Sequence, residues 1–89
     1  MARISVEHAG GTVYRVTVDE RGSQTTHEVR VTEDDVERYA PGAAPERLLE
    51  ASFGFLLERE PKESILSRFD LPVIERYFPE YRRTIREKL

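Results

Sequence analysis

Hydrophobic and polar residues alternate through the first third of the chain. In the segments 3–8, 14–19 and 27–31, apolar or histidine side chains occupy every second position, and polar side chains lie between them. Because neighbouring side chains of a strand point to opposite faces of a sheet, this alternation predicts strands with one buried and one solvated face. Glycine-containing stretches of the kind found in hairpin turns separate the segments. We therefore expect a three-stranded antiparallel meander over residues 1–31.

The next part of the chain predicts two helices of different length. Thr32 is followed at the third position by an acid, Asp35, and this spacing is typical of a capping box at the start of a helix. That first helix is expected to be short and to end near Tyr39. Pro45 suits the first position of a longer helix, which we expect to run to about Glu60.

The longer helix, 45–60, is apolar on most of its circumference. Its apolar side chains are Leu48, Leu49, Ala51, Phe53, Phe55, Leu56 and Leu57. A helix that is apolar on most sides is buried on most sides, and one small sheet cannot cover it. We therefore expect either the C-terminal helices or a second copy of the chain to pack on its other side.

One glycine, Gly54, lies inside this helix, where glycine costs about 1 kcal/mol relative to alanine. The cost suggests a reason for the glycine, such as the close approach of another backbone. An intrachain contact, or a glycine that arose by drift without any role, is the simpler interpretation, and a homodimer contact is the alternative. For a homodimer, the candidate interface residues are Gly54, Phe53, Phe55 and Leu57.

Prolines divide the last third of the chain into short segments. We expect helices at 62–68, at 71–78 with Asp70 as the capping residue, and at 79–88. Short helices are marginal without tertiary packing, so these segments must dock against the rest of the chain. The expected fold class is therefore α+β, with an N-terminal three-stranded antiparallel meander followed by three to four helices packed on one face.

Composition excludes several classes of protein. The chain has 89 residues, which suffice for a single domain over 1–89, comprising the meander 1–31 and a helical part 32–89. The absence of cysteine excludes disulfide frameworks and thiolate-ligated zinc. No apolar run approaches the ~18 residues of a membrane span, and the first residues lack the apolar stretch of a secretory signal. We therefore expect a cytoplasmic protein that does not interact with a membrane.

Charge is distributed unevenly along the chain. The whole chain has 14 basic and 17 acidic residues, whereas residues 71–89 have five basic and three acidic ones. The segment 62–88 is predicted to contain a short helix, a turn and a second helix, which is the order of a helix-turn-helix motif. The second helix of such a motif would present basic side chains to nucleic acid. The candidate contacts are Arg76, Arg82, Arg83 and Arg86. Three features oppose this alternative: the net charge is −3, Asp70 stands where a turn glycine is usual, and Pro79 interrupts the second helix.

Two histidines fall on the buried face of the expected meander. In its simplest register, His8 lies opposite Tyr14, and His27 lies opposite Val16. The two histidines occupy the outer strands, which places them roughly 10 Å apart because neighbouring strands are separated by ~4.8 Å. A metal ion needs its ligands at about 2 Å, so one ion does not reach both side chains in this register. A ligand or metal site on the His8/His27 face is thus an alternative, and histidines bonded to backbone or water are the favoured interpretation.

Aromatic residues gather in the second half of the chain. Those that could line a small-molecule pocket are Phe53, Phe55, Phe69, Tyr77, Phe78 and Tyr81. Aromatic side chains at helical spacing are more often core residues. The chain contains no phosphate-binding glycine loop, metalloprotease motif or nucleophile elbow. We therefore expect no catalytic residue, metal ion or cofactor, and a non-enzymatic interaction or regulatory module whose partner is another protein or a second copy of the chain.

One long run carries a resemblance to known proteins. The run SFGFLLEREPKESILSRFDLPVIERYFPEY covers residues 52–81. It resembles a family of small uncharacterised bacterial proteins, most distinctively in FLLEREPKESIL, FDL and RYFPEY. The resemblance implies a bacterial, cytoplasmic, single-domain protein, and it implies no activity, ligand or site.

Overall fold

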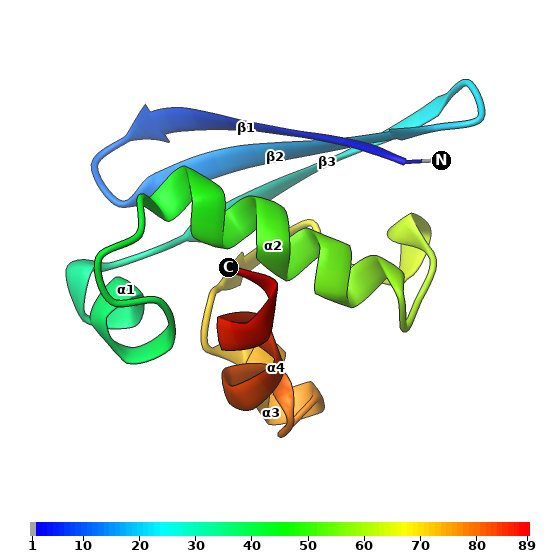
Figure 1. The fold of residues 1–89 in the computed structure, drawn as a ribbon. Helices are drawn as coiled ribbons and strands as arrows, with labels where there is room; N and C mark the ends of the chain where they lie inside the picture. The colour runs from blue at the N-terminus through cyan, green and yellow to red at the C-terminus, as the bar shows by residue number, and fades with distance from the viewer. Residues whose placement is uncertain (1) are drawn as a thin grey trace.

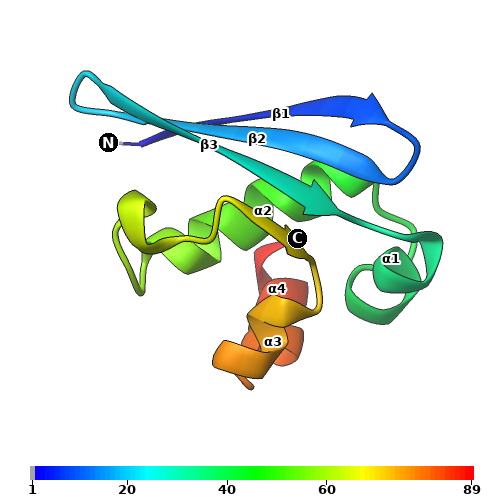
Figure 2. The same ribbon diagram turned by 180° about the vertical axis from the view of Figure 1, so that it is seen from behind.

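A computed structural model describes residues 2–89 and shows a four-stranded sheet whose one face is covered by helices (Figures 1 and 2). In chain order the elements are β1 (Arg3–Gly10), β2 (Val13–Glu20), β3 (Ser23–Arg30), α1 (Glu33–Tyr39), α2 (Pro45–Leu57), the 3-10 helix η1 (Lys62–Ser64), β4 (Arg68–Asp70), α3 (Val73–Tyr77) and α4 (Tyr81–Lys88). The predicted α+β class is confirmed, and the sheet contains one strand more than the three expected.

The meander has the register that the alternation of residues predicts. His8 is the partner of Tyr14 across β1 and β2, and His27 is the partner of Val16 across β2 and β3. A shift of one residue would move every side chain of a strand to the opposite face. The register is therefore fixed by the core, in which Val16 and Val18 are completely buried.

Local sequence signals set where the first two helices begin. The Thr32 hydroxyl accepts a hydrogen bond from the Asp35 amide at 3.1 Å, and an Asp35 carboxylate oxygen accepts one from the Thr32 amide at 3.0 Å. These two bonds form the predicted capping box. Pro45 occupies the first turn of α2, as predicted, because its missing amide proton would have no partner there. The helix ends at Leu57, three residues before the expected end at Glu60.

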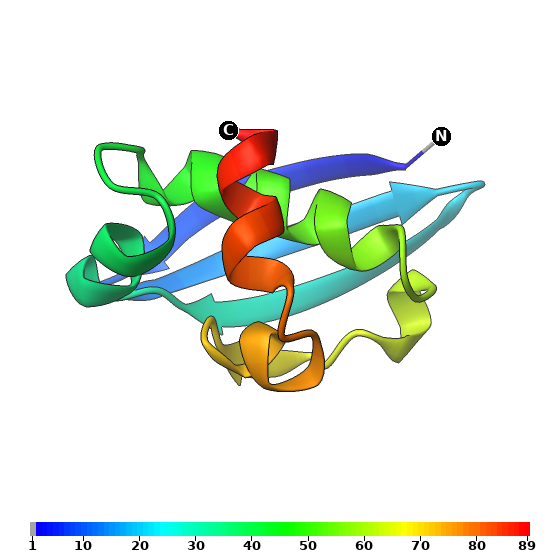
Figure 3. The ribbon, with the colours of Figure 1, turned by 60° about the horizontal axis from the view of Figure 1, so that its bottom comes forward.

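The long helix α2 is covered on two sides by its own chain. Phe53 faces the sheet, where its ring lies 5.2 Å from the ring of His27. Phe55 faces the other way, with its ring 5.3 Å from that of Tyr81 in α4. Figure 3 shows α4 crossing α2 on the side away from the sheet. The sheet and α4 of the same chain thus supply the packing that the apolar circumference of α2 requires.

Residues 62–68 do not form the expected helix. Only Lys62–Ser64 are helical, as one 3-10 turn, and Arg68–Asp70 form β4, which pairs in parallel with β3. The Glu28 amide donates to the Ser67 carbonyl at 2.8 Å, and Phe69 lies beside Val29. The free edge of β3 offers unpaired amide groups, and an extended segment satisfies them where a helix cannot. This strand replaces the first helix that a helix-turn-helix would need.

Two short helices close the chain. The predicted capping role of Asp70 is wrong, because this residue ends β4, and α3 begins after Pro72 without a side-chain cap. Phe78 ends α3 immediately before Pro79, as predicted, and α4 begins at Tyr81. None of the helices within residues 2–89 has the length and apolar character that a membrane crossing needs.

Candidate binding groove

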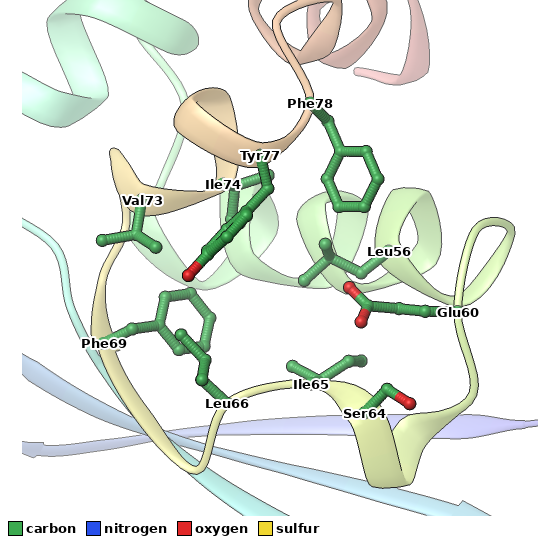
Figure 4. Close-up of a pocket in the computed structure, with 10 residues that line it drawn as sticks. All are labelled: Leu56, Glu60, Ser64, Ile65, Leu66, Phe69, Val73, Ile74, Tyr77 and Phe78. Carbon is green, nitrogen blue, oxygen red and sulfur yellow. The ribbon is translucent and has the colours of Figure 1, made fainter.

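A solvent-open groove lies between α3 and the segment 64–69, with the end of α2 behind it (Figure 4). Its volume is about 450 Å³. The groove is lined by Leu56, Glu60, Ser64, Ile65, Leu66, Phe69, Val73, Ile74, Tyr77 and Phe78. A mostly apolar hollow of this size with a few polar groups is typical of a binding site.

The floor of the groove belongs to the hydrophobic core. Leu56, Ile65, Phe69 and Ile74 are all buried and are also members of the main core cluster. Each comes from a different segment: α2, the loop before β4, β4 itself and α3. The floor is therefore held in place by the packing of the whole domain, which makes it a preformed surface.

The rim of the groove carries exposed apolar side chains. Leu66 is 48% exposed and Tyr77 is 68% exposed. In the described part of the chain only Leu89, near the C-terminus, is a further exposed large hydrophobic residue. Figure 4 shows the Tyr77 side chain pointing from α3 towards the wall formed by Phe69 and Leu66. Adjoining apolar groups that remain in contact with water mark sites of interaction.

One wall of the groove is anchored by a buried histidine. His27 Nδ1 lies 2.8 Å from the Leu66 carbonyl oxygen, and Nε2 lies 2.9 Å from the Thr25 hydroxyl. Because a carbonyl oxygen can only accept, Nδ1 carries a proton and donates to it. Nε2 forms a second hydrogen bond, with the Thr25 hydroxyl. His27 thereby ties the segment that contains Leu66 to the middle of the sheet.

The opposite wall, α3, is anchored by an ion-pair cluster behind it. The Tyr39 hydroxyl donates to Glu75 Oε1 at 2.8 Å, and Arg82 Nε lies 3.1 Å from Glu75 Oε2. The hydrogen bond from Tyr39 holds the pKa of the Glu75 carboxyl below its usual value, and Arg82 adds to this effect. Burial raises the pKa of Tyr39, so its hydroxyl keeps the proton that it donates. The cluster links α3 to α1 and α4.

A carboxylate without a partner lies at one end of the groove. Glu60 follows the end of α2, and its side chain extends towards Leu56 and Ile65 in Figure 4. Among residues 2–89, none forms a hydrogen bond or an ion pair with the Glu60 carboxylate. By contrast, the nearby carboxylate of Glu58 has a partner, because Lys88 Nζ lies 3.0 Å from it. The groove therefore combines an apolar floor with one free negative charge.

The histidines do not meet at a shared site. The expectation that both histidines are buried is right for His27, which packs against Phe53, and wrong for His8, which is exposed near the end of the sheet. His8 Nε2 donates to the Gly11 carbonyl at 2.8 Å, and His27 Nδ1 donates to the Leu66 carbonyl. Both therefore bond to backbone, as the favoured interpretation expects. Within residues 2–89, no three His, Cys, Asp or Glu side chains are grouped so that they could hold a metal ion.

The candidate homodimer residues on α2 are placed differently from one another. Phe53 and Phe55 are completely buried and offer no surface to a second chain. Leu57 is half-buried. Within the chain, the predicted close approach at Gly54 is wrong, because a Cβ atom built there meets nothing within 4 Å, and a homodimer contact at Gly54 stays a prediction.

The predicted aromatic set divides into two groups. Phe69, Tyr77 and Phe78 line the groove. Phe53, Phe55 and Tyr81 are core residues, consistent with the interpretation that aromatic residues at helical spacing are usually core. The groove residues that sequence reasoning missed, above all Glu60 and Leu66, lie in a stretch that was expected to be regular helix.

The candidate nucleic-acid contacts are all exposed on α3 and α4. Arg82 is engaged with Glu75, and Arg86 Nη2 donates to the Arg38 carbonyl at 2.9 Å. Arg76 and Arg83 lie on different helices, separated by Pro79. Binding of nucleic acid through these residues stays a prediction.

Comparison with models of known protein families found no match, and comparisons with curated proteins and with solved structures found none either. The resemblance of residues 52–81 to a bacterial family therefore also stays a prediction. Functional inference for this chain rests on the geometry of the groove.

Proposed function

We propose that this protein is a small non-enzymatic interaction module that binds a segment of a partner protein in the groove between α3 and residues 64–69. The observation that carries the proposal is the position of Leu66 and Tyr77. The two most exposed of the large hydrophobic side chains among residues 2–89 face one preformed apolar floor. Covering them with an apolar partner gains roughly 25 cal/mol for each Å² of apolar surface removed from water.

The openness of the groove favours a peptide segment over a small molecule. A small ligand gains affinity when a pocket encloses about 70–90% of its surface. This groove is open to solvent along one side, with Leu66 and Tyr77 on its margins. A peptide needs only its apolar side chains buried, and its backbone can cross the open side in water. The rim side chains then add contact area on either side of the backbone.

The test compares a double variant with a matched control. Leu66→Ser with Tyr77→Ser removes the apolar rim, and Leu89→Ser removes the third exposed hydrophobic side chain, which lies outside the groove. A phage-displayed library of random heptapeptides is selected on the wild-type protein. Enriched peptides are expected to bind the wild type and Leu89→Ser equally and the double variant roughly tenfold or more weakly, as at interface hot spots.

Folding of the variants is checked by their thermal transitions. The three substituted side chains are all exposed, so their loss is expected to change the free energy of unfolding by about 0.5 kcal/mol or less each. A library that yields no binder, or binders that do not distinguish the double variant from the wild type, contradicts the proposed function.

A further inference from the structure

We infer that the bound partner segment carries a lysine or arginine beside its apolar anchor residue, and that Glu60 receives this cation. The inference rests on the proposed function and adds the charge of the ligand to it. Three observations carry it: the placement of Glu60 in the groove, the absence of a partner for its carboxylate among residues 2–89, and the apolar character of its neighbours.

The surroundings of Glu60 leave its charge uncompensated. Its side chain is half-buried and extends towards Leu56 and Ile65, both of which are buried apolar residues. Removing water from a carboxylate is unfavourable unless another group replaces the lost hydrogen bonds. A segment that fills the groove would remove more water from Glu60. The complex is therefore stable only if the segment brings a donor for this carboxylate.

Three cations near the end of α2 form ion pairs with acids other than Glu60. Lys62 Nζ lies 2.7 Å from Glu63 Oε2, Lys88 Nζ lies 3.0 Å from Glu58 Oε2, and Arg59 Nε lies 3.1 Å from Glu80 Oε2. Each of these three cations pairs with an acid other than Glu60. A cation supplied by the ligand would therefore not compete with them for the Glu60 carboxylate.

The same arrangement discriminates against acidic segments. An acidic residue beside the anchor would face Glu60 across a partly dehydrated groove, and like charges brought together in this way disfavour a complex. A residue without a hydrogen-bond donor would leave the carboxylate without a partner, and a neutral donor would form a weaker hydrogen bond than a cation does. The apolar side chains on the groove floor thus select the apolar anchor residue of the bound segment. Glu60 selects the charge of the residue next to that anchor.

The experiment repeats the heptapeptide selection on three proteins: the wild type, Glu60→Gln and Glu50→Gln. Glu60→Gln removes the charge from the groove and keeps the size of the side chain. Glu50→Gln is the matched control, because Glu50 is exposed on α2 and does not line the groove. Wild type and Glu50→Gln are expected to enrich peptides with Lys or Arg next to an apolar residue, and Glu60→Gln is expected to lose this enrichment.

Affinities then measure the pairing directly. For the most enriched wild-type peptide, Glu60→Gln is expected to weaken binding about two- to fivefold, in the range of partly exposed ion pairs. Replacing the basic residue of the peptide by glutamine is expected to cause the same loss on the wild type and no further loss on Glu60→Gln.

Each contrary outcome has its own meaning. Peptides that bind through Leu66 and Tyr77 without any preference for a basic residue would overturn the inference and leave the proposed function standing. Failure to enrich any peptide would overturn both. Concentration-dependent self-association that the Leu66→Ser/Tyr77→Ser variant abolishes would assign a second copy of the chain to the groove and would also overturn the inference.

Discussion

Gly54 shows how little a single glycine reveals when only its helical position is known. Its place inside a helix predicted a close contact, whereas a Cβ atom there meets nothing within 4 Å. Sequence alone could not show whether another group packs against Gly54, because the place where α4 crosses α2 depends on how all of the segments after α2 fold. Within a single chain, the glycine therefore has the ordinary helix penalty without a packing benefit.

Gly54→Ala is consequently expected to stabilise the protein by about 0.5–1 kcal/mol, since alanine loses less backbone entropy in a helix. Chemical denaturation of both proteins measures this difference. Gly22→Ala is the control and is expected to destabilise, because Gly22 has φ +77°, in the left-handed region. Destabilisation by Gly54→Ala would show that another group does pack against this position.

His27 is the residue whose role the strand pattern predicted in part. The alternation of residues placed it on the buried face opposite Val16, as observed. Its acceptor, the carbonyl of Leu66, lies 39 positions further along the chain. Such a long-range bond has no signature in the local sequence.

His27→Leu is expected to destabilise the fold by roughly 1–3 kcal/mol, because the Leu66 carbonyl and the Thr25 hydroxyl lose their partner. It is also expected to loosen the groove wall. The amide of Glu28, which donates to Ser67 next to Leu66, should exchange with solvent faster. Unchanged stability together with unchanged exchange at Glu28 would contradict the anchoring role of His27.

At the level of elements, the strand register and two of the predicted helix starts were confirmed, whereas the helix start predicted at Asp70 was wrong. The capping pair Thr32–Asp35 and the first-turn proline Pro45 act through bonds within a few residues, so the sequence predicts them directly. β4 was missed because its three residues are too short for an alternation to stand out, and because its pairing partner β3 is distant in sequence. The groove depends on this strand, and so it could not be predicted either.

The placement of α3 depends on the cluster of Tyr39, Glu75 and Arg82. The pKa of Glu75 in the folded protein is lowered, so the unfolded state binds the proton more readily. This contribution to stability is complete above the ordinary pKa of a glutamate and is lost as the pH falls through the lowered pKa of the folded state.

Glu75→Gln is therefore expected to lower the free energy of unfolding at pH 7 by roughly 1 kcal/mol, the typical value for a partly exposed charge-assisted hydrogen bond. Below the lowered pKa, the difference between the variant and the wild type should shrink. Thermal unfolding between pH 7 and pH 3 measures both effects, with Glu87→Gln, an exposed residue of α4, as the control. A difference that stays constant with pH would exclude Glu75 as a titrating contributor.

For the whole molecule, the apolar circumference of α2 predicted correctly that the helix needs packing on two sides. The sheet provides one side, through Phe53, and α4 provides the other, through Phe55. Of the exposed large hydrophobic side chains among residues 2–89, Leu66 and Tyr77 lie beside the groove, outside α2. The docking surface that the sequence pattern predicted on the long helix stays a prediction, and our proposal uses the groove beside α3 instead.

The most direct test of groove binding is a titration of the ¹⁵N-labelled protein with the most enriched heptapeptide, followed by amide chemical shifts. The chain has 89 residues, so every amide outside proline can be followed individually. We expect the largest shifts at residues that line the groove, from Leu56 to Phe78, and little change on the open face of the sheet. Shifts concentrated on strands β1 and β2 or on the arginines of α4, with the groove unperturbed, would contradict the proposed site.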